Sequence, residues 1–320
     1  MTESLRLLLE HSLDFAGLFP PAAQPMTLAA PAFAADRVGG DGWMLARFVC
    51  PAAKLNELAA VLTVEAGPAG PLAVSALGRN GKTTGEFLAG LDADLSAITA
   101  FRNRVAERAG LGVVEVRLPG DAIAPAALKK LLGTIEALLA RVPNNGLQPF
   151  FELAFSPSLP AQLGVLAEHN AATPARQERP AGFKLRTGGT DPATFPTAEQ
   201  FADVLVAARD ATLPMKCTGG LHHALPHRSA SLGVRMHGFV NVLVAAALAH
   251  HTRADAGTLR AVLEEEQAAA FTFDATGLTW REHRLDLAAL RAARLRFFTA
   301  FGCCYLDRPR AGLRAAGWLQ

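Results

Sequence analysis

Eight short strand-like runs, each closing on or near Gly, Pro or Cys, recur along the chain and alternate with Ala- and Leu-rich stretches. We expect helices between them, for example at 84–109, 125–141 and 197–211, the last capped by Thr197. Strands that alternate with helices form parallel sheets, and eight such units close into a barrel. The sequence therefore predicts an α/β fold, a (β/α)8 TIM barrel. The predicted strands lie at residues 14–20, 43–51, 72–78, 113–120, 149–155, 182–189, 214–220 and 296–304.

An inserted segment of helical and hairpin character, at approximately residues 222–290, separates the seventh strand from the eighth. Within it, FTFDATGLTW (residues 271–280) predicts a hairpin that turns at residues 274–277. The apolar run at 239–249 is expected to be core, or else to cover the barrel mouth or pack in a dimer. Nothing that flanks the segment has the composition of a linker, so we expect one barrel domain over residues 1–320.

Composition argues against several classes of protein. Half of the 320 residues are hydrophobic, and the net charge of +2 comes from interspersed acids and bases without a basic run. The apolar run at 239–249 is too short to span a bilayer, and the first residues lack the pattern of a signal peptide. The four cysteines do not form a disulfide framework. We expect a cytoplasmic protein without nucleic-acid or membrane partners, and a homo-oligomer stays open.

Charged residues alternate with apolar ones in four of the predicted strands. If the apolar parity faces the helices, the charged parity faces the barrel interior. Charges there are costly unless they serve one another or a ligand, and barrel active sites lie at the carboxyl ends of the strands. Structural ion pairs remain the alternative for any single residue, but the whole set favours a functional site. The residues expected to face inward are Glu115, Arg117, Glu152, Lys184, Arg186 and Lys216.

This inner set carries a surplus of positive charge, which predicts a small anionic metabolite as the substrate. Lys184 and Lys216 are 32 residues apart, one strand–helix–strand unit, and should therefore lie on neighbouring strands at similar heights. Repulsion between the two ammonium groups and burial both predict lowered lysine pKa values. A neutral lysine is a nucleophile that condenses with carbonyl compounds, and Glu115 is placed to move the protons.

Five short motifs in order resemble the class I deoxyribose-phosphate aldolases and their Schiff-base barrel relatives. They are KLRTG (184–188), KCTGGL (216–221), the LD…LFP stretch (13–20), FVCP (48–51) and FGCC (301–304). The resemblance implies that Lys184 forms the imine, that Lys216 tunes it, and that Glu115 shuttles protons where the family has an aspartate. It also implies that no cofactor and no metal are needed.

The chain departs from the family pattern at several positions. Cys303 and Cys304 replace a serine pair that helps to hold phosphate, Arg186 stands where a small residue is usual, and the insertion is foreign to the family. These departures leave the substrate open. The residues that we expect to bind substrate are Arg117, Glu152, Arg186, Gly188, Gly219, Gly220, Asp14, His222 and Gly302.

Two further features have more than one interpretation. The Gly-Gly pairs at 188–189 and 219–220 either present backbone N–H groups to an anion or simply make tight turns. His222, His223 and His227 are metal ligands, simple loop histidines, or a source of one residue that lines the pocket mouth. The favoured prediction has no metal.

The function predicted from the sequence is that of a class I aldolase-like carbon–carbon lyase, acting through a lysine Schiff base on a small anionic carbonyl compound. Two alternatives stay open. The first is another barrel enzyme, a transferase or decarboxylase, that uses the lysines only electrostatically on an anionic substrate. The second is a non-catalytic barrel that binds a metabolite.

Overall fold

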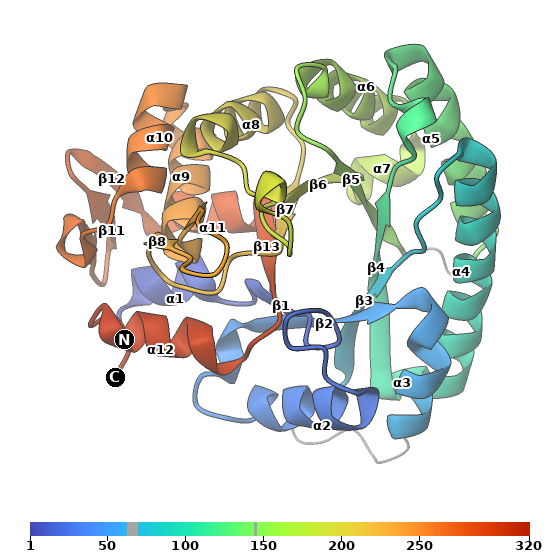
Figure 1. Cartoon of the computed structure of the whole chain (residues 1–320), viewed down its shortest axis with the longest axis horizontal. Coiled ribbons are helices and arrows are strands. Elements are labelled where there is room, and N and C mark those ends of the chain that lie inside the picture. The colour runs from blue at the N-terminus through green and yellow to red at the C-terminus, as the bar shows by residue number, and fades with distance from the viewer. Residues whose placement is uncertain (63–69, 144–145) are drawn as a thin grey trace.

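The computed structural model describes residues 1–62, 70–143 and 146–320. Eight parallel strands close into a barrel in the order β1-β13-β7-β6-β5-β4-β3-β2 (Figure 1). The predicted (β/α)8 barrel is therefore confirmed, and each predicted run overlaps one barrel strand. The barrel strands are β1 (Leu13–Phe15), β2 (Leu45–Pro51), β3 (Leu72–Leu77), β4 (Ala109–Arg117), β5 (Gln148–Leu153), β6 (Gly182–Arg186), β7 (Met215–Thr218) and β13 (Phe298–Cys303).

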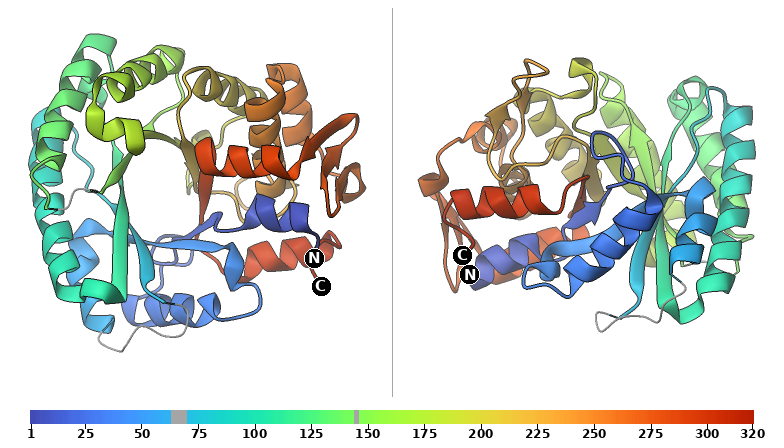
Figure 2. Two further views of the ribbon diagram at one scale, coloured as in Figure 1. Left: turned by 180° about the vertical axis from the view of Figure 1, so that it is seen from behind. Right: turned by 60° about the horizontal axis from the view of Figure 1, so that its bottom comes forward.

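Helices surround the barrel, as the view from behind in Figure 2 shows. They bury the apolar, outward-facing parity of its strands. Local sequence sets several of their ends. Thr197 and Gln200 form the capping box that begins α8, and Thr83 caps α4. The helices are α1 (Glu3–Leu9), α2 (Met26–Arg37), α3 (Leu55–Val61), α4 (Thr84–Val105), α5 (Pro125–Leu139), α6 (Leu159–Ala172), α7 (Pro174–Glu178), α8 (Ala198–Asp210), α9 (Phe239–Thr252), α10 (Ala256–Glu264), α11 (Leu287–Arg296) and α12 (Asp307–Ala315).

The first barrel strand is shorter than the sequence predicts. It ends at Phe15, and the following residues turn at the barrel mouth instead of extending the ladder. Pro20 and Pro21 have no N–H group to donate to a neighbouring strand, which explains why the strand cannot continue through them. The turn adds residues to the cavity described below, and Phe19 is one of them.

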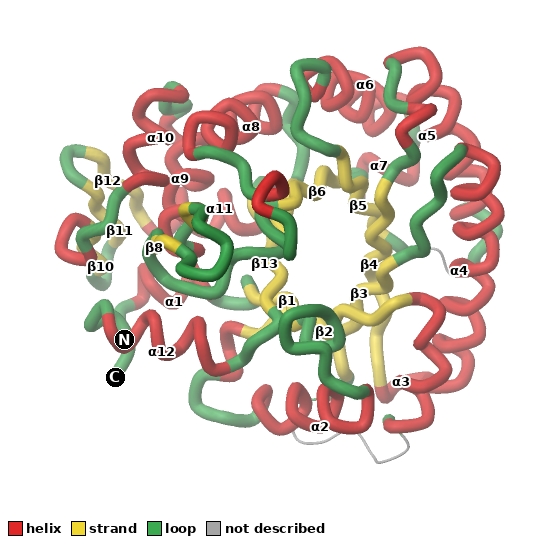
Figure 3. The backbone as a smooth tube through the Cα atoms, viewed as in Figure 1, coloured by secondary structure: helices red, strands yellow, loops and turns green. Residues whose placement is uncertain are grey.

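Between β7 and β13 the chain forms a two-stranded ribbon, three helices and a small separate sheet. The ribbon is β8 (His227–Arg228) with β9 (Arg235–Met236), and Figure 3 shows it within loops. The predicted hairpin is confirmed by the antiparallel pair β10 (Phe271–Phe273) and β11 (Gly277–Trp280), to which β12 (His283–Asp286) adds an unpredicted third strand.

Helix α9 carries the apolar run that the sequence left with three interpretations. Its residues from Phe239 to Ala249 are all buried, and it packs against α8, α10, α11 and β13. The run is therefore core in this chain. Among the described residues, no helix combines the length and the apolar character that a membrane crossing requires.

Candidate active site

A cavity of about 550 Å³ lies at the carboxyl ends of the barrel strands. It brings together most of the site residues expected from the sequence. Two other predicted residues do not line the cavity: Glu152 is buried beside the lining, and Arg117 is exposed at the end of β4. The sequence-predicted residues that line the cavity are Asp14, Glu115, Lys184, Arg186, Gly188, Lys216, Gly219, Gly220, His222 and Gly302.

The two lysines lie side by side in the strand register, because Lys184 of β6 pairs with Lys216 of β7. Glu115 of β4 bridges them with one carboxylate oxygen each, at 2.9 Å from Lys184 Nζ to Oε2 and 2.6 Å from Lys216 Nζ to Oε1. The side chains of all three are nearly inaccessible to solvent. The hydroxyl of Ser75 on β3 donates a further hydrogen bond of 2.6 Å to Glu115 Oε1.

These residues are the centre of an alternating chain of positive and negative groups, which we call the charge chain. On one side, Lys216 Nζ contacts Asp14 Oδ2 at 2.5 Å, and Asp14 Oδ1 contacts Arg47 Nη1 at 3.5 Å. On the other side, Lys184 Nζ contacts Glu152 Oε2 at 3.0 Å, and Glu152 Oε1 contacts Arg186 Nε at 2.9 Å. The charge chain runs Arg47, Asp14, Lys216, Glu115, Lys184, Glu152, Arg186.

The expectation of a lowered pKa for Lys184 is wrong for this arrangement. Burial alone would lower the pKa of Lys184, but Glu115 and Glu152 outweigh burial and raise it above its usual value. Burial would likewise raise the pKa of Glu115, and Lys184 and Lys216 hold it well below its usual value. Repulsion between the lysines and burial both favour a lowered pKa, but the carboxylates that contact Lys184 reverse the direction.

The charge surplus is also smaller than expected. Arg117, which parity placed inside the barrel, does not reach the cavity, because its strand ends there and its side chain is in solvent. Asp14 adds a negative charge that the sequence count did not include. The remaining cationic groups of the mouth are Arg186, whose side chain is 43% exposed, and Arg308 of α12. Arg308 makes no ion pair among the described residues and lies over the Tyr305 ring.

Two glycine turns pack against each other at the ends of β6 and β7. Gly219 and Gly220 have φ angles of +79° and +77°, a region that disfavours other residues. A Cβ atom on Gly220 would lie 2.5 Å from the carbonyl oxygen of Thr187, and one on Gly188 would lie 2.7 Å from the Cα of Gly220. Close packing therefore requires glycine here. In the described part of the chain, the N–H groups of Gly219 and Gly220 donate no hydrogen bond.

Three histidines line the same cavity, and burial lowers the pKa of each. The pKa of His222 falls to about 4, with Arg308 as the next cause, and that of His227 also falls to about 4. Burial and Arg308 lower the pKa of His223. His222 Nδ1 contacts Cys303 Sγ at 3.3 Å, and the rings of His223 and His227 are 3.9 Å apart. Neutral imidazoles at neutral pH supply hydrogen bonds to a ligand without adding charge. No group of three or more His, Cys, Asp or Glu in the described ranges is arranged to hold a metal ion.

Sequence reasoning missed several residues of this site. Ser75 lies at the inward parity of its strand, between Val74 and Ala76, so the period-two argument could have found it. Ser229 and Met236, which the β8–β9 ribbon brings to the cavity, had no comparable signal. Their position depends on how the segment after β7 folds back over the mouth.

Two solved structures are similar to the chain at low identity. A deoxyribose phosphate aldolase from Aeropyrum pernix, described as having a unique tetrameric structure, is 14% identical, with 68% of this chain and 80% of that chain covered and a TM-score of 0.40. A GH6 enzyme from Orpinomyces sp. Y102 is 10% identical, with 70% and 73% covered and a TM-score of 0.33. Neither TM-score is high enough to support a conclusion about this chain. No protein-family model and no curated protein matches the sequence.

Proposed function

We propose that this protein is a class I aldolase-like lyase in which Lys184 forms a Schiff base with a small anionic carbonyl compound. The observation that carries the proposal is the single Glu115 carboxylate shared by two buried lysines at the mouth of a parallel barrel. A nucleophilic amine needs a partner that takes and returns protons, and Glu115 touches the amine directly. The lysine motifs that resemble the Schiff-base aldolases agree with these roles.

The resting ammonium of Lys184 must lose a proton before it reacts. When a carbonyl group enters the cavity, that proton passes to Glu115, and the neutral amine attacks the carbonyl carbon. The oxygen takes the proton from Glu115, and the new C–N nitrogen returns one to the same carboxylate. The hydroxyl then leaves as water with that proton, so that an iminium forms beside an ionised Glu115.

Bond cleavage uses the same carboxylate. Glu115 takes the proton of the substrate hydroxyl on the carbon beyond the bond to be broken, and that C–O becomes the carbonyl of the first product. The electron pair of the broken C–C bond forms an enamine with the iminium nitrogen. The enamine carbon takes back the proton, and hydrolysis of the resulting iminium frees the second product and Lys184.

The anionic group of the substrate is assigned to the cationic rim of the cavity. Arg186 uses only Nε to bind Glu152, and Arg308 has no acidic partner among the described residues, so both have donors left. The unused N–H groups of Gly219 and Gly220 add donors that carry no full charge. The partners that we propose are a small anionic metabolite and, in a homo-oligomer, further copies of the chain.

Reductive trapping with borohydride tests the imine directly. The protein is incubated with pyruvate, dihydroxyacetone phosphate or acetaldehyde, reduced, and digested for mass spectrometry. We expect an adduct on the peptide that contains Lys184, its loss in Lys184→Met, and its retention in Lys129→Met, which changes an exposed lysine. An equal adduct yield in Lys184→Met, or no adduct in the wild type with any probe, contradicts the Schiff-base mechanism.

One observation favours a second candidate. The carboxylates that raise the pKa of Lys184 keep it charged at neutral pH, which suits an electrostatic clamp for an anionic substrate in a transferase or decarboxylase. A wild type that binds an anionic probe tightly at this cavity without a reducible adduct would support the clamp.

A further inference from the structure

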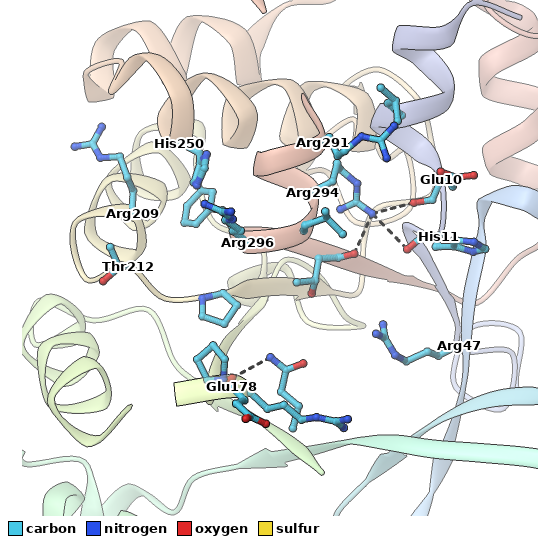
Figure 4. Close-up of a pocket in the computed structure, with 18 of the residues that line it drawn as sticks. Glu10, His11, Arg47, Glu178, Arg209, Thr212, His250, Arg291, Arg294 and Arg296 are labelled. Atoms are coloured by element: carbon cyan, nitrogen blue, oxygen red, sulfur yellow. Dashed lines mark hydrogen bonds between the residues drawn. The ribbon is translucent and has the colours of Figure 1, made fainter. Parts of the chain in front are cut away.

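A second cavity, of about 960 Å³, opens at the opposite end of the barrel, where the strands begin. Residues that precede or open five strands line it, among them His11, Gln148, Pro180, Pro214 and Phe297. We call it the lower cavity. The ends of α8, α9 and α11 complete its wall, and Figure 4 shows their side chains around it. It is separate from the 550 Å³ cavity and takes no part in the proposed reaction.

Arginine dominates the lower cavity. Six arginines line it against two carboxylates, Glu10 and Glu178. Glu10 already pairs with Arg6 at 3.4 Å, outside the lining. The six arginines are Arg47, Arg179, Arg209, Arg291, Arg294 and Arg296.

Most of these charges have no acidic partner. Arg47 contacts Asp14, and Arg209 contacts the neighbouring Asp210 at 2.9 Å. Within the described ranges, the other four make no ion pair. Arg291 and Arg296 make no hydrogen bond there either, and both are exposed to the cavity. Like charges that face one cavity repel one another, and a bound anion would relieve that repulsion.

Arg294 shows the imbalance most clearly. Its guanidinium binds only backbone carbonyls, those of Glu10 and His11 at 3.3 Å, Thr299 at 3.0 Å, and Phe298. Its Nε atom is buried without a hydrogen-bond partner in the described structure. The pKa of Arg294 is lowered to about 10, chiefly because burial outweighs the opposing charge of Asp14, and Arg47 contributes to the lowering. Within the part of the chain that the structure describes, Arg294 makes no ion pair with an acid.

We propose that the lower cavity binds a small polyanion that carries two or more phosphate or carboxylate groups. Guanidinium groups bind such groups through charge-assisted and often bidentate hydrogen bonds, and here several converge on one concave space. A single anion would neutralise charges contributed by α11, β2 and the segment before β6 together. The concave shape admits a small molecule, whereas a nucleic-acid duplex would need a basic surface that follows its backbone.

Isothermal titration calorimetry with inorganic pyrophosphate on the full chain tests the proposal at low ionic strength, because salt screens such binding. The wild type should bind saturably, and the double variant Arg291→Ala/Arg296→Ala should bind about tenfold more weakly per arginine removed. The matched control, Arg104→Ala/Lys130→Ala, removes two exposed positive charges outside the lower cavity and should bind like the wild type.

Both altered arginines are exposed and make no ion pair or hydrogen bond among the described residues, so the double variant should melt close to the wild-type temperature. The proposal is overturned if the wild type shows no saturable binding, or if the double variant binds as the wild type does. Equal weakening in the control would also overturn it, because only net charge would then matter. If a short single-stranded oligonucleotide displaces pyrophosphate at a lower total concentration of phosphate groups, the ligand is a polymer and the proposal of a small polyanion is overturned. The readout is binding, so it is independent of any turnover.

Discussion

The charge chain makes a sharp prediction about Glu115→Gln and Lys184→Met. Each single change leaves a buried charge without one of its partners, and breaking a buried ion pair costs about 3–5 kcal/mol. Glu115→Gln removes a carboxylate that contacts two lysines, while Lys184→Met leaves Glu115 and Glu152 each with one cation fewer. We therefore expect each single variant to be destabilised by about that amount.

The double variant should recover most of this loss. Without Glu115 and Lys184, the remaining groups fall into two separate sets, Asp14 with Arg47 and Lys216, and Glu152 with Arg186. No buried carboxylate or ammonium then lacks a partner. Replacement of both members of a buried pair by groups of similar shape is often close to neutral, so we expect the double variant within about 1 kcal/mol of the wild type.

Thermal melting of the four proteins at neutral pH measures these differences. For 320 residues the entropy of unfolding is about 0.7 kcal/mol per degree, so each single variant should lower Tm by roughly 4–8 °C. The matched control is the exposed pair Lys129 and Glu168, 3.5 Å apart, where the same substitutions should change stability by less than about 1 kcal/mol. Additive losses in the Glu115–Lys184 cycle, with the double variant the least stable, would refute the charge chain as a coupled unit.

Two further predictions follow from the same structure. Because the pKa values of Glu115 and Glu152 are lowered, the stability that they contribute is complete above the usual glutamate pKa and is lost as pH falls through the lowered values. The pKa of Lys184 is raised, so the stability that it contributes persists through neutral pH and is lost only at strongly alkaline pH. Tm measured against pH should show a plateau between these limits, and a maximum confined to acidic pH would contradict it. Gly220→Ala should destabilise the protein by about 1–3 kcal/mol, because φ is +77° and the new Cβ atom would meet a backbone carbonyl. Gly133→Ala in α5, where a Cβ atom would have nothing within 4 Å, should stabilise it by about 0.5–1 kcal/mol. Urea unfolding measures both changes, and equal effects would contradict the conformational argument.

The barrel could be predicted because its evidence is local. Strand runs with period-two alternation and terminal Gly or Pro recur at intervals long enough for a helix between them, and each run owes its pattern to burial beneath helices. The neighbouring positions of Lys184 and Lys216 follow from the same spacing, since consecutive parallel strands of a barrel lie side by side. The prediction of the first strand was wrong at its carboxyl end, because the apolar residues after Phe15 form a turn at the barrel mouth.

The electrostatics of the site could not be predicted in the same way. Asp14 and Lys216 are 202 residues apart, and they meet only because β13 closes the barrel between β7 and β1. The direction of the Lys184 pKa shift depends on how closely Glu115 and Glu152 approach its ammonium group, which strand parity does not decide. The lower cavity depends still more on closure, although three of its arginines stand close together in α11, in the sequence RAARLR.

The charge chain and the lower cavity share one residue, Arg47, which couples the two ends of the barrel. Arg47 lines the lower cavity with a side chain that is 30% exposed, and it also contacts the fully buried Asp14. Asp14 is in turn the second partner of Lys216. A polyanion that draws Arg47 toward itself would leave Asp14 to Lys216 alone and tighten that pair at the expense of the contact between Lys216 and Glu115. Lys216 would then lower the pKa of Glu115 less strongly, and Glu115 would accept a proton from Lys184 more readily. Occupancy of one end of the barrel would therefore alter proton transfer at the other.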